Sequence, residues 1–127
     1  MARIIGMGGV FLKAGDPKTL ASWYQEKLGI PFNGSPYTSF QFTDNDGKIT
    51  PGYNVLSFFK TNSDYFDPSQ KPTMLNLRVD DLVTFLNELR EKKVTIVGDM
   101  VDEEYGKFAW ILDPEDNKIE LWEPPAT

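Results

Sequence analysis

Apolar and polar residues alternate with a period of two along most of this chain, and two segments show a helical period instead. Alternation predicts strands, because successive side chains of a strand point to opposite faces of a sheet. The predicted strands cover residues 3–14, 37–43, 53–60, 74–79, 95–101, 107–112 and 118–122. After residues 16 and 81, apolar residues recur at spacings of three and four, which predicts two amphipathic helices. The order of elements is therefore a strand, a helix and further strands, twice.

Both predicted helices have capping residues at their starts and stop signals at their ends. Asp16 is a good N-cap, and Pro17 suits the first helical position. The apolar pattern of this helix stops at Gly29, a residue type that favours helix C-termini. The second helix is expected to start after Asp81 and to end near Lys92, where a positive charge interacts favourably with the helix dipole.

The two halves of the chain match one another at an offset of 65 residues. Residues 12–14 fall on residues 77–79, and Asp16 falls on Asp81. Any two amphipathic strand–helix units look this alike, but the order of the elements also agrees. We predict a single domain over residues 1–127 with two modules, residues 1–60 and 73–125, joined by the polar linker 61–72. The bare faces of the two sheets would then enclose a cleft.

Composition narrows the chemistry that is available. The chain has no histidine and no cysteine, which excludes disulfides, thiolate nucleophiles and the commonest metal ligands. Acid–base chemistry would fall to carboxylates, lysine or tyrosine. The 13 basic and 19 acidic residues give a net charge of −6, which disfavours nucleic acid and mildly favours a cationic ligand.

Membrane association is not expected either. No apolar stretch approaches the roughly 18 residues of a membrane span, and the first residues lack a signal-peptide pattern. The sequence therefore predicts a soluble, cytoplasmic protein that binds neither nucleic acid nor a membrane.

The last predicted strand carries an unusual residue. Ile119 and Leu121 point to one face by the two-residue period, whereas Glu120 and Trp122 point to the other. A carboxylate is thus expected beside an indole, on the face away from the aliphatic core. Two interpretations remain open: Glu120 faces water on a half-exposed strand, or it lies inside the cleft.

Residues 113–121, DPEDNKIEL, resemble the closing signature DP(D/E)GN-x-(I/V)EL of the vicinal oxygen chelate superfamily, with Asp116 in place of the usual glycine. Asp16-Pro17 with Trp23-Tyr24 and Leu28-Gly29, and Val79-Asp80-Asp81, extend the resemblance over nearly the whole chain. The superfamily includes glyoxalase I, extradiol dioxygenases and bleomycin-resistance proteins. Residues 63–66, 104–106 and 120–124 look more closely like a glyoxalase-like subgroup whose function is mostly unassigned. The resemblance implies an α+β fold in which two βαβββ modules form curved mixed sheets around a cleft.

The resemblance also bears on metal binding. Metal-using members hold their ion with one inward residue on the first strand and one on the last strand of each module. Carried over to this chain, these positions fall on Gly9, Met74, about Leu56, and Glu120. Of these, only Glu120 offers a ligand that divalent ions commonly choose, and one carboxylate does not hold such an ion against water. No metal and no cofactor are therefore expected.

Alternation predicts a set of side chains that face the cleft and bind a ligand there. The set is Phe11, Lys13, Met74, Asn76, Arg78, Trp110, Glu120 and Trp122. Aromatic and thioether walls with a few polar groups suit a flat, partly apolar molecule. In the alternative interpretation, Phe11, Met74 and Trp122 only fill the core, and Lys13 or Arg78 forms an ion pair with Glu120. Further aromatic candidates for the cleft are Tyr37, Phe40, Phe42, Tyr53, Phe58 and Phe59.

Two classes of function are compatible with this set. The first is a metal-independent binding protein of the bleomycin-resistance type, which sequesters a small aromatic or partly apolar ligand. The second is an enzyme of the glyoxalase, lyase or isomerase type, with Glu120 as the catalytic base or as a metal ligand. The aromatic content of 13%, together with the resemblance, also predicts a homodimer, because exposed aromatic patches usually mark interfaces.

Overall fold

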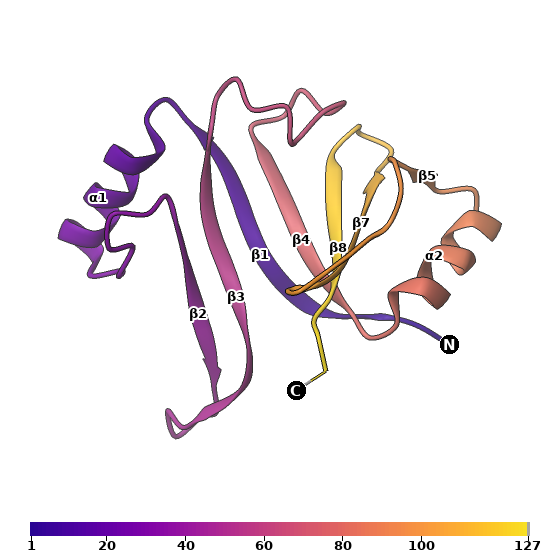
Figure 1. Ribbon diagram of the computed structural model, residues 1–127, viewed down its shortest axis with the longest axis horizontal. Coiled ribbons are helices and arrows are strands. Elements are labelled where there is room, and N and C mark those ends of the chain that lie inside the picture. The colour runs from indigo at the N-terminus through magenta and orange to yellow at the C-terminus, as the bar shows by residue number, and fades with distance from the viewer. Residues whose placement is uncertain (127) are drawn as a thin grey trace.

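The computed structural model describes residues 1–126 as two helices and eight strands that belong to one mixed sheet (Figure 1). The elements are β1 (Ile4–Ala14), α1 (Pro17–Leu28), β2 (Tyr37–Thr43), β3 (Ile49–Lys60), β4 (Thr73–Val79), α2 (Leu82–Glu91), β5 (Thr95–Ile96), β6 (Val101–Glu103), β7 (Gly106–Leu112) and β8 (Lys118–Glu123). The strand order is β2-β3-β1-β4-β8-β7-β5, and β6 pairs with β7. The predicted α+β architecture is confirmed.

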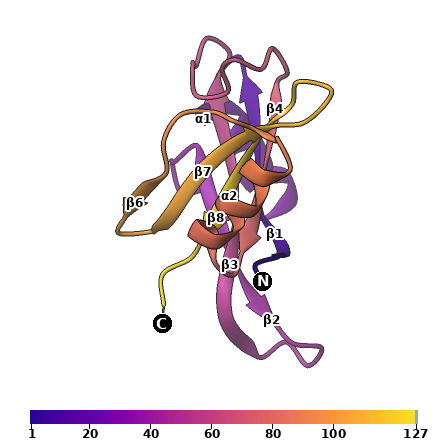
Figure 2. The same ribbon diagram turned by 90° about the vertical axis from the view of Figure 1, so that its right-hand side faces the viewer.

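The two halves of the chain meet in the middle of the sheet. There β1 runs antiparallel to β4, while β1 and β3, and likewise β4 and β8, run parallel. Both helices cover the same face of the sheet: α1 packs on Ala14 and Phe58, and α2 packs on Val79, Ala109 and Leu121. Figures 1 and 2 show that the sheet curves away from the helices, so its other face is concave.

The predicted helix ends agree with the structure. Asp16 Oδ1 accepts a hydrogen bond from Thr19 N at 3.1 Å, and Asp81 Oδ1 accepts one from Thr84 N at 3.2 Å. Gly29 ends α1 in the left-handed conformation, with φ of 74°. Among residues 1–126, no helix is long and apolar enough to cross a membrane.

One predicted strand, residues 95–101, is wrong as a continuous element. It divides into the short strands β5 and β6, because Gly98 between them takes a φ of 72°, a left-handed value that interrupts a regular strand. The gap between the predicted strands 95–101 and 107–112 is correspondingly shorter, since β6 extends to Glu103 and β7 begins at Gly106. By contrast, β3 begins at Ile49, four residues before the predicted start, and prolongs its hairpin with β2.

The substituted glycine of the signature lies in the β7–β8 turn. Asp116 has a φ of 63°, a conformation that glycine adopts freely and that aspartate tolerates better than most residues. Asp113 Oδ1 closes the turn by accepting hydrogen bonds from the backbone N–H groups of Glu115 and Asn117, both at 2.9 Å. The turn therefore keeps its shape despite the exchange of glycine for aspartate.

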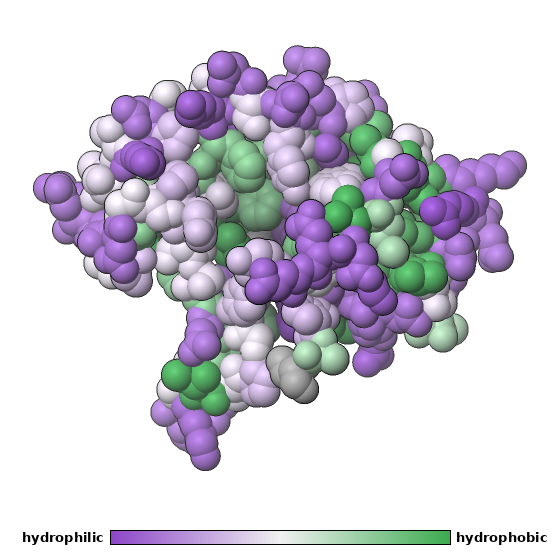
Figure 3. Space-filling view, viewed as in Figure 1, coloured by the Kyte–Doolittle hydropathy of each residue, from purple (hydrophilic) through white to green (hydrophobic). Residues whose placement is uncertain are grey.

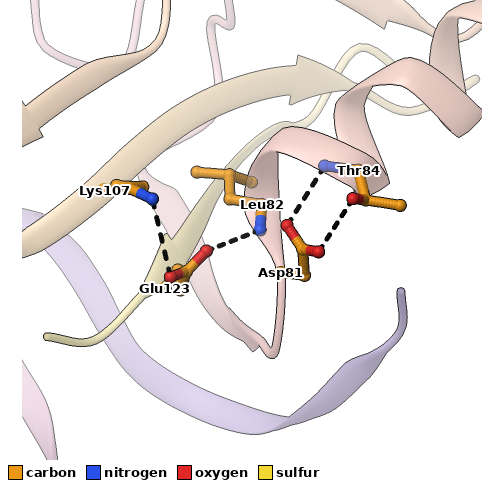
Figure 4. Close-up of polar contacts among 5 residues, drawn as sticks. All are labelled: Asp81, Leu82, Thr84, Lys107 and Glu123. Carbon is orange, nitrogen blue, oxygen red and sulfur yellow. Dashed lines mark hydrogen bonds and ion pairs between the residues drawn. The ribbon is translucent and has the colours of Figure 1, made fainter. Parts of the chain in front are cut away.

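Glu123, at the end of β8, connects the sheet to the start of α2 (Figure 4). Its Oε1 accepts a hydrogen bond from Leu82 N at 2.8 Å, and its Oε2 lies 3.9 Å from Lys107 Nζ. The carboxylate satisfies one of the free N–H groups of the first helical turn and places a negative charge at the positive end of the dipole. Asp81, just before α2, and Glu123, at the end of β8, thus both cap α2.

We expect Glu123→Ala to lower the free energy of unfolding by about 1–2 kcal/mol, because it leaves the Leu82 N–H without its partner. Glu123→Gln keeps an acceptor oxygen and loses only the charge, so its cost is expected to stay at about 0.5 kcal/mol. Urea denaturation measures both, with Glu26→Ala on the exposed side of α1 as the control. Equal losses for the alanine and glutamine variants would contradict the assigned hydrogen bond.

Candidate functional site

The concave face of the sheet contains a cavity of about 450 Å³ that both halves of the chain enclose. It is lined by Gly8, Phe11, Tyr37, Thr38, Ser39, Tyr53, Val55, Asn76, Tyr105, Phe108 and Trp122. The space-filling view shows apolar side chains at the bottom of a hollow near the centre of this face, surrounded by more hydrophilic ones (Figure 3). A single chain therefore builds the cleft.

Aromatic rings from opposite walls meet at Trp122. The Tyr53 ring, from β3, lies 5.4 Å from the Trp122 ring on β8, and the Phe108 ring is parallel to it at 6.2 Å. The indole N–H donates a hydrogen bond to the carbonyl oxygen of Tyr105 at 2.8 Å, which fixes the orientation of the ring. Trp122 is 4% exposed and lines the cavity, so it forms a rigid apolar wall.

Glu120 lies inside the cleft and is only 2% exposed, so the interpretation that it faces water is wrong. Its Oε1 accepts a hydrogen bond from the Tyr65 hydroxyl at 3.1 Å, while its Oε2 is buried without a partner. The carboxyl group borders a smaller cavity of about 230 Å³, which it shares with Tyr65, Phe108 and Trp110. Trp110 Nε1 is likewise buried and has no partner.

Burial raises the pKa of Glu120 to about 7, because a charged carboxylate is poorly solvated here. Contacts with Tyr65, Asn76 and the charge of Lys118 oppose this rise. Burial and the neighbouring Glu120 raise the pKa of Tyr65 far above its usual value, so its hydroxyl remains a donor. Burial also lowers the pKa of Lys118.

Lys118 does not form an ion pair with Glu120 among the residues that the structure describes. Its Nζ donates to the carbonyl oxygen of Tyr65 at 2.7 Å and lies 5.5 Å and 5.6 Å from the ring centroids of Tyr65 and Trp110. The Lys118 ammonium group therefore holds the Tyr65 backbone in place and does not neutralise the carboxyl group through a direct ion pair.

The segment 61–72 contributes to this site, although periodicity suggested only a connection there. Phe66 is completely buried among Phe11 and Met74, and Tyr65 stacks on Phe59 with ring centroids 5.4 Å apart. The sequence signal was present in the aromatic pair Tyr65-Phe66 within an otherwise polar stretch. Without a period, however, that pair does not indicate which surface it covers.

Six of the eight predicted ligand-binding residues line a cavity, and two do not. Trp122, Asn76 and Phe11 line the main cavity, Trp110 and Glu120 line the smaller one, and Arg78 lines a third cavity that adjoins the main one. Met74 is buried in the cluster with Phe11 and Phe66, so the core-filling alternative describes Met74 best. Lys13 Nζ lies 5.3 Å from the Phe66 ring and, like Met74, does not line these three cavities.

The structure corrects some of the predicted cleft positions on β2 and β3, and it shows cleft residues that the sequence pattern did not predict. Leu56 and Phe58 pack against α1, so the cleft position on β3 is Val55, one residue away. Phe40 is 41% exposed. Periodicity did not identify the cleft residues Tyr65, Tyr105, Phe108 and Lys118.

The residues around Glu120 do not fit the metal that the superfamily implies. Within residues 1–126 there is no group of three or more acidic side chains that could hold an ion, and the sequence has no histidine or cysteine. Added side chains would also lack room on β1: a Cβ at Gly8 would overlap Asn76, and one at Gly9 would overlap the backbone of Val55. The first-strand position therefore accepts no ligand-bearing side chain.

Residues 6–121 match the family described as the Glyoxalase/Bleomycin resistance protein/Dioxygenase superfamily. The chain belongs to this superfamily, and the match confirms the resemblance that the closing signature indicated. A comparison with the sequences of curated proteins gives no match.

Several solved structures share the fold of this superfamily member. Methylmalonyl-CoA epimerase of Streptomyces coelicolor, in complex with 2-nitronate-propionyl-CoA, superposes with a TM-score of 0.68 at 13% identity, covering 98% of this chain and 100% of that one. The epimerase of Mycobacterium tuberculosis gives 0.61 at 19% identity, with coverages of 97% and 90%. A Legionella pneumophila protein described as an NAD-dependent benzaldehyde dehydrogenase gives 0.59 at 16% identity, with coverages of 92% and 98%. At these identities the likeness establishes the fold alone.

The pKa of Glu120 predicts a specific pH dependence of stability. Because the folded protein holds this proton up to about pH 7 and the unfolded chain only to about 4.5, unfolding releases a proton between these values. The free energy of unfolding should therefore fall as pH rises from 4.5 through 7, by on the order of 2–3 kcal/mol. Glu120→Gln removes this contribution. Urea denaturation of both proteins between pH 4.5 and 8 measures it, and parallel pH profiles would refute the assigned pKa.

Proposed function

We propose that this protein binds a small, flat, partly apolar molecule in the cleft without a metal ion. The main support is the cavity of about 450 Å³, whose walls are largely aromatic and which is bordered by Asn76 Oδ1, a buried oxygen without a partner. Such a combination of apolar walls and a few convergent polar groups is typical of small-molecule sites. The fixed orientation of Trp122 supports a preformed site, which reduces the ordering cost of binding.

The unpartnered polar atoms indicate what the ligand offers in return. Asn76 Oδ1 and Glu120 Oε2 are buried oxygens, and Trp110 Nε1 is a buried N–H donor. A buried polar group without a hydrogen bond costs about 1–3 kcal/mol, so a ligand that supplies the missing partner gains this free energy. The ligand should therefore carry both a hydrogen-bond donor and an acceptor along one edge of its apolar body.

Acid–base catalysis by Glu120 is the second candidate function. It is favoured by one observation, a buried carboxyl group with a pKa of about 7 and one oxygen without a partner at the border of a cavity. A group with such a pKa exchanges protons readily at neutral pH. In this role the Tyr65 hydroxyl would hold the carboxyl group in place.

We expect 2-naphthamide, a flat neutral probe, to bind in the cleft, and Trp122→Ala to weaken its binding by about 1–3 kcal/mol through the loss of the ring wall. Titrations followed by NMR of the backbone and indole N–H groups measure the dissociation constant. Tyr53→Ala tests the opposite wall if Trp122→Ala fails to fold. Trp23→Ala, on the exposed surface of α1, is the matched control.

Binding should be unchanged by a chelator, since no step depends on a metal ion. Probe shifts outside the cleft, or an affinity that is lost with the chelator, would contradict the proposal. A flat ketone with a C–H group next to its carbonyl, incubated with the protein in D₂O and followed through its own proton NMR signals, tests the second candidate: loss of that C–H signal that stops in Glu120→Gln would assign proton transfer to this carboxyl group.

We further propose that the protein is a cytoplasmic homodimer. Met7 and Leu75 are exposed apolar residues on β1 and β4, and their register partners Leu77 and Val10 lie on the helix-bearing face of the sheet. A second copy covering this strip would remove it from water in a two-fold arrangement. Light scattering at micromolar concentration should give twice the mass of one chain, and the mass of one chain would refute the dimer.

A further inference from the structure

Arg78 is a cation on the cleft side of β4 that has no charged partner. Its Nε atom is buried without a hydrogen bond. The ion pairs in the described part of the chain join Arg3 to Asp80 and Lys107 to Glu123, so Arg78 takes part in neither. A partly buried cation without a partner is costly, and such costs are usually offset by a bound group. The geometry of Arg78 therefore points to an anion.

The Arg78 guanidinium lies over an aromatic ring. Its central carbon lies 4.8 Å from the centroid of Phe42, on β2 across the cleft. Gly52 leaves the room for this stack: a Cβ there would lie 2.8 Å from Phe42 Cδ2 and 3.3 Å from Arg78 Nη2. The N–H groups of a guanidinium lie in a planar fork, in which a carboxylate can accept two of them.

A cavity of about 520 Å³ borders this guanidinium and adjoins the main cavity, since Tyr53 and Tyr105 line both. Asp80, Glu104 and Glu123 also line it. Asp80 already accepts from Arg3 N at 2.8 Å, and Glu123 caps α2 and pairs with Lys107. With no second free cation among the lining residues, the site suits a single negative charge better than a phosphate dianion.

We infer that the ligand of the proposed site is a flat, partly apolar carboxylic acid whose carboxylate binds Arg78; this inference rests on the proposed function. In register, Asn76 lies opposite Glu120 and Arg78 lies opposite Trp122. Two residues along a strand span about 7 Å, which is roughly the length of one substituted aromatic ring. The apolar body then lies beside Trp122 and Tyr53, with a hydrogen-bonding group toward Asn76 and the carboxylate at the Arg78 end.

The test compares three probes of the same shape, 2-naphthoate, its neutral amide 2-naphthamide and 2-naphthyl phosphate, by NMR titration at low ionic strength. We expect the wild-type protein to bind 2-naphthoate about tenfold more tightly than the amide. Arg78→Gln should weaken the binding of 2-naphthoate about tenfold and so abolish this preference, with a much smaller effect on 2-naphthamide. Arg90→Gln on α2, which covers the other face of the sheet, makes the same change in net charge and should keep the preference. Melting temperatures confirm that each variant folds.

Each contrary outcome is informative. Equal affinities for 2-naphthoate and 2-naphthamide in the wild-type protein would overturn the carboxylate inference and leave the proposed binding function intact. A preference for 2-naphthoate that survives Arg78→Gln would assign the charge to another residue and overturn the role of Arg78. Tighter binding of 2-naphthyl phosphate would overturn the choice of a carboxylate. If none of the three probes binds, the proposed function and this inference fail together.

Discussion

The antiparallel pairing of β1 with β4 is the constraint on which the cleft depends. It joins the two halves into one sheet, and the parallel partners β3 and β8 then stand on opposite sides of this central pair. Because sheets twist and this one curves away from the helices, β3 and β8 approach each other, as the contact of Tyr53 with Trp122 shows. Gly8 and Gly9 are required at the floor, since any side chain there would overlap Asn76 or Val55.

The same close packing separates this chain from metal-binding members of its superfamily. A metal site needs three or four ligands that converge on one point. Here the strand that would supply the first of them has Gly8 and Gly9 at that place, and Glu120 is surrounded by a hydroxyl, an amide and an indole. An isolated carboxyl group in such surroundings is most stable when neutral, whereas a metal ligand must be ionised.

Sequence patterns predicted the parts of this structure that are locally determined. The helix caps at Asp16 and Asp81 depend on residues three apart, and the two faces of β8 depend on a strict period of two. Periodicity failed where register or tertiary contacts decide. The superfamily position carried over to about Leu56 falls on the helix-bearing face of β3, whereas Val55 faces the cleft, because a one-residue slip exchanges the two faces of a strand. Tyr65 and Phe66 have no period to follow, and only the folded chain brings them to Glu120.

The protonation state of Glu120 follows from where the neighbouring cation is directed. Lys118 lies two residues before Glu120 on the same face of β8, yet its ammonium group donates to the Tyr65 carbonyl and lies near two aromatic rings. An ion pair with Lys118 would have kept the carboxylate charged at neutral pH. With Lys118 directed elsewhere, Glu120 accepts from Tyr65 through Oε1 and, when protonated, presents a donor at Oε2. Near neutral pH the same oxygen can therefore either donate to a ligand or accept from one, which makes recognition in this cleft sensitive to pH.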